Sequence, residues 1–145
     1  MWLTDEQQRV WRGYLAMVNR LQVAMNRQLQ QDCGLSLADY DVLVELSERG
    51  PLRIFELAGA LVWEQSRLSH QLSRMRTRGL VKRRGSDDDR RGATVELTDS
   101  GRAALEAAAP GHVALVRATV FDGMSRAQLK SLGSLTATVL ERLTD

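Results

Sequence analysis

The 145-residue sequence has one cysteine, Cys33, and no long apolar run. A single thiol excludes an intramolecular disulfide, which fits a protein of a reducing compartment. Residues 1–12 mix charged side chains with Trp2 and Trp11 and therefore lack the apolar core of a signal peptide. Because no run reaches the length of a membrane span, we expect a cytoplasmic protein whose 43% hydrophobic residues build a globular core.

Motifs of catalysis and of metal binding are also missing. The sequence shows no nucleophile–base pair, no phosphate-binding loop and no metal motif. His70 has no second His or Cys at ligand spacing, and His112 is expected to be an ordinary surface or interface residue. We therefore expect neither an enzyme nor a protein with a metal or cofactor.

The net charge is only +2, but the basic residues are unevenly placed. The segment 67–91 holds nine of the twenty Lys and Arg residues, and its only acids are three consecutive aspartates. These nine residues are Arg67, Arg74, Arg76, Arg78, Lys82, Arg83, Arg84, Arg90 and Arg91. One basic segment on a near-neutral chain indicates a polyanionic partner. The alternative is an ordinary solvated basic face.

Helical periodicity predicts a mainly α-helical chain. Helices are expected over about 4–31, 37–47, 54–61 and 64–78, followed by two more after Thr98. Two short strands, over about 80–84 and 94–97, enclose a polar loop bounded by glycines, and Leu52 is a candidate for a strand of one or two residues.

Several residues mark where these helices begin and end. Thr4 with Gln7, and Ser125 with Gln128, have the spacing of a capping box at the start of the first and last helices. Glycines at positions 34 and 79 are expected to end helices. Pro110 should kink or interrupt the fifth helix.

A short helix, a tight turn, a second helix and a hairpin make a winged helix-turn-helix. We expect a single domain over 1–145, of mainly α class with a small β-hairpin (α+β). Its DNA-binding lobe would be about 35–97, and the flanking segments, about 1–34 and 98–145, carry wide or leucine-rich apolar stripes. A small winged lobe cannot cover these stripes alone, so they predict dimerisation.

The helix over 64–78 has an apolar side and a polar side free of acids. At about 100° per residue, Leu72 and Met75 fall within about 40° of Leu68, and this side is expected to be buried. The opposite side and its edges collect Ser66, Arg67, Ser69, His70, Ser73, Arg74 and Thr77. Hydroxyl groups among Arg and His suit a DNA groove, because Arg pairs bidentately with guanine and Ser reaches bases or phosphates. An ordinary solvated helix would mix Glu with Lys.

The loop between the strands offers a second contact. Arg90 or Arg91 at its tip can reach a minor groove, whose narrow A·T tracts attract guanidinium groups. Asp89 is a poor DNA ligand and is expected to anchor a neighbouring Arg and fix the shape of the loop. An exposed turn with a local ion pair is the alternative.

These motifs resemble the MarR family of bacterial regulators. The resemblance rests on Leu57-Ala58, the run from Ser66 to Leu72, Met75, Gly79-Leu80-Val81, Arg84, Asp89-Arg90-Arg91, Val95-Glu96-Leu97-Thr98 and Gly101, and it covers nearly the whole chain. The run Trp63-Glu64 with Ser66 to His70 is similar to variants common in actinobacteria.

The resemblance implies a winged-helix homodimer joined by the first, fifth and sixth helices. It assigns groove contacts to Arg67, Ser69, His70, Ser73 and Arg74, the wing contact to Arg91 with Arg90 beside it, and the anchoring role to Asp89. Members often repress their own or a divergent operon, and are often released by phenolic or lipophilic ligands or by oxidation. A twofold dimer would place its recognition helices ~34 Å apart on a palindromic site.

Sensing residues are less clearly marked. Trp11, Tyr14, Tyr40 and Trp63 are candidates to line a ligand cavity between the dimer helices and the lobe, and plain core and interface packing is the alternative. Cys33 lies at the end of the first helix without a cation or helix N-terminus to lower its pKa, so we expect an inert thiol rather than a redox sensor.

The sequence therefore predicts a homodimeric, DNA-binding repressor released by a small-molecule ligand. Two alternatives stay open: a winged-helix protein-interaction module, and a DNA-binding regulator without its own ligand.

Overall fold

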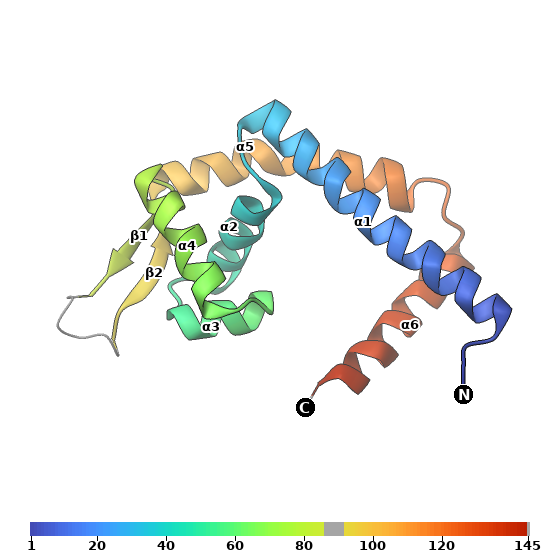
Figure 1. Cartoon of the computed structure of the whole chain (residues 1–145). Helices are drawn as coiled ribbons and strands as arrows, with labels where there is room; N and C mark the ends of the chain where they lie inside the picture. The colour runs from blue at the N-terminus through green and yellow to red at the C-terminus, as the bar shows by residue number, and fades with distance from the viewer. Residues whose placement is uncertain (86–91, 145) are drawn as a thin grey trace. The chain divides into compact units, whose positions relative to one another are not determined.

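A computed structural model describes residues 1–85 and 92–144, and these residues form six α-helices and a two-stranded hairpin in the predicted order (Figure 1). The elements before the hairpin are α1 (Asp5–Cys33), α2 (Leu37–Arg49), α3 (Ile54–Leu61) and α4 (Gln65–Thr77). Strands β1 (Val81–Arg84) and β2 (Thr94–Leu97) precede α5 (Asp99–Val116), a π-helical turn (Arg117–Phe121) and α6 (Arg126–Leu143). Among the described residues, no helix combines the length and the apolar character needed to cross a bilayer.

The helix boundaries follow local capping chemistry. Gln7 N donates to Thr4 Oγ1 (3.0 Å) and Thr4 N donates to Gln7 Oε1 (2.9 Å), which confirms the capping box predicted for α1. Ser125 and Gln128 make the same pair of bonds at α6. Gly34, at φ 67°, ends α1 in the left-handed conformation that glycine adopts without strain.

The hairpin pairs β1 antiparallel with β2, with Val81 opposite Leu97 and Arg84 opposite Thr94. Leu52, in the connection between α2 and α3, forms the predicted short strand as an isolated bridge to Val95. Leu52 N donates to Val95 O (3.0 Å), and Val95 N donates to Leu52 O (2.8 Å). The α2–α3 connection is therefore fixed to the hairpin.

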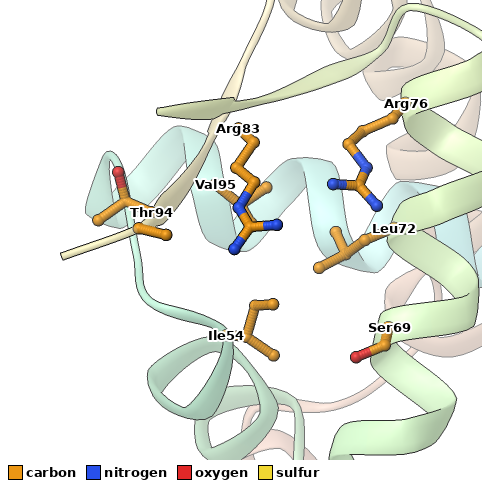
Figure 2. Close-up of a pocket in the computed structure, with 8 residues that line it drawn as sticks. Ile54, Ser69, Leu72, Arg76, Arg83, Thr94 and Val95 are labelled. Atoms are coloured by element: carbon orange, nitrogen blue, oxygen red, sulfur yellow. The ribbon is translucent and has the colours of Figure 1, made fainter. Parts of the chain in front are cut away.

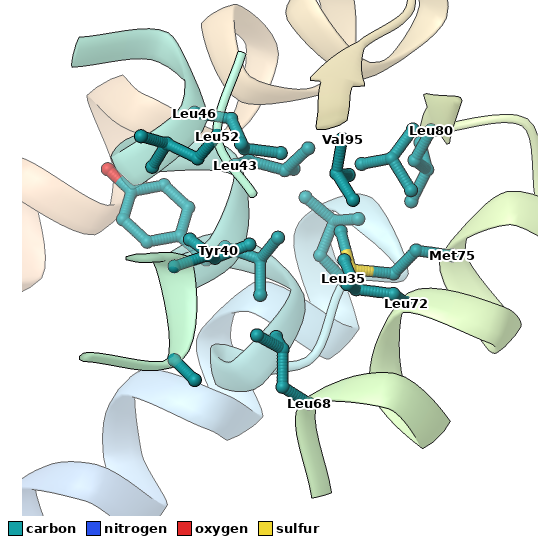
Figure 3. Close-up of a cluster of buried hydrophobic side chains, with 14 of the residues drawn as sticks. Leu35, Tyr40, Leu43, Leu46, Leu52, Leu68, Leu72, Met75, Leu80 and Val95 are labelled. Atoms are coloured by element: carbon teal, nitrogen blue, oxygen red, sulfur yellow. The ribbon is translucent and has the colours of Figure 1, made fainter. Parts of the chain in front are cut away.

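One hydrophobic core lies within residues 1–112, which form the first of two compact units (Figure 3). Leu68, Leu72 and Met75 of α4 are at most 2% exposed, as the helical wheel predicted. They pack with buried side chains of α2, α3 and the hairpin, and with Leu29 of α1. Because α4 is amphipathic, this packing decides which of its residues face outward.

The start of α5 fits closely against the end of α4. Thr98 Oγ1 donates to Gly79 O and accepts from Gly101 N (2.9 Å). A Cβ atom on Gly101 would lie 2.0 Å from Leu80 O. This close approach gives a physical reason for the Leu-Thr-x-x-Gly run that follows the hairpin.

The prediction of an interruption at Pro110 was wrong, because α5 continues through this residue to Val116. Proline removes one backbone donor and leaves the carbonyl of Glu106 without its helical partner. Both residues are exposed, so water can satisfy that carbonyl. Regular α-helical geometry instead gives way after Val116, in the π-helical turn that the sequence analysis did not anticipate.

The second unit, residues 113–145, contains the π-helical turn and α6. None of the residues of α6 is buried in the described chain. Its large exposed apolar residues are Leu129, Leu135, Val139, Leu140 and Leu143.

Candidate nucleic-acid interface

The outward face of α4 consists of the residues that the sequence analysis selected. Ser66, Arg67, Ser69, His70, Ser73, Arg74 and Thr77 are all exposed. The thirteen residues of α4 include neither Asp nor Glu. We call these seven residues the α4 face. They give a cationic, hydroxyl-rich surface, which can donate hydrogen bonds to an anionic partner.

A tight turn sets the direction of α4 relative to α3. Val62 adopts the left-handed conformation at φ 58°, which is unusual for a β-branched residue. Trp63 N donates to Ala58 O (3.0 Å), which closes the turn, and α4 begins at Gln65. The α3–turn–α4 unit is therefore a helix-turn-helix whose second helix carries the α4 face outward.

On one edge of the α4 face, Arg67 lies against Trp63. The guanidinium carbon is 4.2 Å from the ring centroid, a cation–π contact that restricts the arginine without using its donors. The charge of Arg67 also acts on Asp41 of α2. Burial raises the pKa of the Asp41 carboxyl, the positive charge of Arg67 lowers it, and the negative charge of Glu45 raises it. Trp63 thus contacts a residue of the α4 face, and its predicted place in a ligand cavity stays a prediction.

Arg74, on the same edge, is held by a buried glutamine. Arg74 Nη2 donates to Gln71 Oε1 (2.9 Å), and Gln71 is only 5% exposed. Gln71 Nε2 in turn donates to Asp39 Oδ1 on α2. The sequence analysis missed Gln71, although a polar residue beside Leu72 on the margin of the apolar side was a signal that it is buried with a partner.

On the other edge, a cleft of about 200 Å³ separates α4 from the hairpin (Figure 2). Its lining consists of Ile54, Ser69, Leu72, Arg76, Arg83, Ala93, Thr94 and Val95. Arg76 reaches it from α4 and Arg83 from β1, over an apolar floor that includes Leu72 and Val95. Two guanidinium groups at one cleft can hold an anion such as a DNA phosphate. Neither Arg76 nor Arg83 was assigned to the site from the sequence.

The hairpin carries further cations close to an acid. Glu96 Oε1 lies 3.5 Å from Lys82 Nζ, and Glu96 Oε2 lies 3.5 Å from Arg84 Nη1. Both cations are mostly exposed, so these ion pairs are weak. The predicted wing residues, Asp89, Arg90 and Arg91, lie outside the described residues, and their roles stay predictions.

The four candidate ligand-lining aromatic residues make separate contacts. Trp11 and Tyr14 stack on each other at 5.6 Å between ring centroids, and both are about half exposed. Tyr40 is 8% exposed and lies 4.3 Å from the ring of His112. Trp63 contacts Arg67, as described above. These contacts do not test the predicted ligand cavity, which stays a prediction.

His112 is more enclosed than a surface histidine. It is half-buried against Tyr40, and its Nδ1 atom is buried without a hydrogen-bond partner among the described residues. Burial lowers the pKa of His112, because the imidazolium loses hydration. Burial, followed by the charge of Asp41, raises the pKa of Tyr40.

Cys33 is a free, half-buried thiol that packs against the core. Within the described ranges, no group of three His, Cys, Asp or Glu side chains is placed to hold a metal ion.

Comparison with known proteins places this architecture in a family. The MarR family model matches residues 35–92, the segment that holds the helix-turn-helix and β1. An uncharacterized HTH-type transcriptional regulator of Bacillus cereus is 29% identical over 126 residues, covering 87% of this chain and 83% of the relative.

Two solved structures from Streptomyces coelicolor are similar over nearly the whole chain. AbsC, a MarR family transcriptional regulator, is 36% identical with a TM-score of 0.90, over 99% of this chain and 97% of AbsC. Sco3205, a MarR family transcriptional regulator solved in complex with DNA, is 42% identical with a TM-score of 0.91, over 99% of this chain and 95% of Sco3205. Identity at this level along the full length shows that the chain belongs to the MarR family of transcriptional regulators.

Proposed function

We propose that this regulator is a cytoplasmic homodimer that binds a palindromic operator in double-stranded DNA and represses transcription. The observation that carries the DNA-binding part is the α4 face, whose seven exposed residues are free of carboxylates. Arg67 and Arg74 lie on one edge of this face, and Arg76 extends the cationic surface beyond the other edge. The DNA complex of the similar protein Sco3205 supports the same assignment.

The α4 face would enter the major groove, where Arg74 would pair with guanine. Arg76 and Arg83, at the cleft beside the hairpin, would hold a phosphate of the backbone strand that passes there. Arg90 and Arg91 would reach the adjacent minor groove, as the sequence predicted.

Exposed apolar side chains on the terminal helices support the homodimer. On α1, Val10, Trp11, Tyr14 and Met17 are between 48% and 67% exposed. On α6, Leu129, Leu135, Leu140 and Leu143 are between 50% and 73% exposed. An exposed apolar stripe on a helix usually marks an interface, and a second copy of the same helices would cover such stripes.

The DNA-binding proposal is tested by selecting genomic fragments that the protein retains, footprinting them, and titrating the labelled duplex by fluorescence anisotropy. We expect a palindromic footprint, and a slope of log K against log salt of about −0.9 per neutralised phosphate. Arg74→Ala should reduce selectivity for the footprinted sequence by ~1–3 kcal/mol. Arg49→Ala is the matched control, because Arg49 is an exposed arginine of α2 outside the α4 face.

Two results would contradict the proposal. A folded Arg74→Ala protein that binds like the parent would remove the assignment of the α4 face. A response that does not change with salt would favour the alternative, a protein-interaction module of the same fold.

We further propose that a phenolic or lipophilic ligand releases the repressor. Support comes from the aromatic residues Trp11, Tyr14 and Tyr40 and from the unpartnered Nδ1 of His112 beside Tyr40. A panel of such compounds should raise the melting temperature and lower the affinity for the footprinted duplex. If no compound does either, the chain is a DNA-binding regulator without its own ligand.

The sign of regulation needs a separate measurement. Deleting the gene should increase transcription from the promoter that contains the footprint. A decrease would make the protein an activator.

A further inference from the structure

We infer that Asp39 and Gln71, which do not face the proposed DNA surface, are positioning residues that set the base selectivity of Arg74. The inference rests on the proposed function, because it assumes that the α4 face reads DNA. Its basis is a chain of side-chain hydrogen bonds that runs from the first turn of α2 to the edge of the α4 face.

Gln71 is the central link, and its amide can take only one orientation. Its neighbour on one side is the Asp39 carboxylate, which only accepts hydrogen bonds, so the NH₂ group must point there. The remaining atom, Oε1, therefore faces Arg74 and accepts from its Nη2 at 2.9 Å. The neutral amide of Gln71 thus links the buried carboxylate of Asp39 to the exposed guanidinium group of Arg74 and restricts the orientation of that group.

Asp39 is itself held firmly. It is 4% exposed, and its Oδ2 accepts from Ser36 N (2.9 Å) and from Arg78 Nη1 (2.8 Å). Asp39 N donates to Ser36 Oγ (3.0 Å), which completes the capping box of α2. The carboxylate therefore cannot turn away from Gln71 without breaking a helix cap and an ion pair.

Arg78 ties the same carboxylate to the end of α1. Its Nη2 donates to Gly34 O (2.8 Å), while its Nη1 contacts Asp39. The turn between α1 and α2 and the C-terminal end of α4 are thereby connected through one buried anion. Arg74 is fixed to this framework rather than to its own helix alone.

The consequence concerns the free donors of Arg74. One Nη2 hydrogen is taken by Gln71, and the other donors of the planar fork make no hydrogen bond within residues 1–85 and 92–144. An arginine held in this way loses less rotamer freedom when it pairs with a guanine, and it is less able to reorient toward a wrong base. Removing the Gln71 acceptor should therefore reduce discrimination between bases more than it reduces phosphate binding.

The experiment is a double-mutant cycle on the full-length protein. Gln71→Met keeps the length of the side chain but removes both polar groups, and it is combined with Arg74→Ala. The readout is the ratio of dissociation constants for the footprinted duplex and for a duplex with one base pair changed at the position where Arg74→Ala loses selectivity. Gln30→Met, at an exposed glutamine of α1, is the matched control.

We expect Gln71→Met to reduce this ratio about five- to tenfold, at the lower end of the range that one bidentate arginine contact supplies. The slope of log K against log salt should stay at the parental value, because no phosphate contact is lost. In the Arg74→Ala background, Gln71→Met should change the ratio no further. Gln30→Met should keep the parental ratio.

A second variant covers the case in which Gln71→Met does not fold. Gln71→Lys still offers a donor to Asp39 but gives Arg74 no acceptor, and it should show the same loss of selectivity. If either folded variant keeps the parental ratio, or loses it equally in both backgrounds, the positioning role is wrong. If Arg74→Ala itself keeps the parental ratio, the proposed reading surface fails, and the inference fails with it.

Discussion

The winged lobe and α6 differ in how far their leucines are buried. In the lobe, Leu57 and Leu68 are completely buried, and the polar residues of α4 face outward. In α6, Leu135 is 61% exposed and no residue is buried in the described chain. The leucines of the lobe therefore lie in one core, which Leu29 of α1 and Ala108 of α5 complete, whereas the apolar residues of α6 are not buried in the described chain. Under the proposed homodimer, the packing of α6 would therefore depend on a second copy, whereas that of the lobe would not.

The largest effect should come from the core of the lobe. Leu68→Ala removes a side chain with no exposed surface and should lower the free energy of unfolding by about 2–5 kcal/mol. Leu140→Ala, at a 64% exposed leucine of α6, is the comparison, and its effect should depend on protein concentration. Urea unfolding at two protein concentrations measures both. Equal losses, independent of concentration, would break the contrast between the two regions.

The second largest loss of stability should come from the junction between the lobe and α5. Gly101→Ala places a methyl group against Leu80 O, where a Cβ would lie 2.0 Å away, and should cost about 1–3 kcal/mol. Gly133→Ala in α6 is the control, because a Cβ atom there meets no described atom within 4 Å. Thermal unfolding should separate the two variants, with Gly133→Ala close to the parent or slightly more stable. A Gly101→Ala protein as stable as the parent would show that α5 can move away from Leu80 at no cost.

The exposed stripe of α6 should matter for association. Leu135→Ala should weaken the proposed dimer by about 1–2 kcal/mol, the value of a partly buried leucine at an interface. Sedimentation equilibrium gives the dissociation constant directly. Thr138→Ala, on the same exposed helix but outside the leucine stripe, serves as control. An unchanged dissociation constant for Leu135→Ala would place the interface elsewhere.

The smallest effect should be the pH response of His112. Burial holds the pKa of His112 below its usual value of 6.5, so the unfolded chain takes up the proton first as the pH falls. The contribution of neutral, buried His112 to the free energy of unfolding is therefore complete above pH 6.5 and is lost as the pH drops below that value. His112→Phe keeps a ring against Tyr40 and should flatten this part of the profile. Urea unfolding between pH 7.5 and 5.5 measures it, and parallel profiles for parent and variant would contradict the assignment.

Local signals predicted most of the fold because they act over a few residues. Thr4, Ser125 and Gly34 marked helix ends through bonds that close within three or four positions. The apolar period of α4 predicted which side is buried. The prediction that Pro110 interrupts α5 was wrong, because proline costs a helix less where water can bind the carbonyl that lost its partner.

The links that orient the candidate site could not be predicted in this way. Gln71 and Asp39 are 32 positions apart, and neither the helical period nor a motif pairs them. Arg76 and Arg83 meet at one cleft only because β1 folds back beside α4. The sequence identified which residues are exposed on α4, and tertiary packing decides which of them are held in place.

The most direct test of the central claim, that the α4 face binds DNA, is the affinity of Ser73→Glu for the footprinted duplex. Ser73 lies in the middle of the α4 face and is exposed, so glutamate there should leave the melting temperature close to the parental value. A carboxylate in the groove would repel the phosphates and meet base-edge acceptors, and we expect at least about a hundredfold loss of affinity. A folded Ser73→Glu protein that binds the duplex with parental affinity would contradict the account.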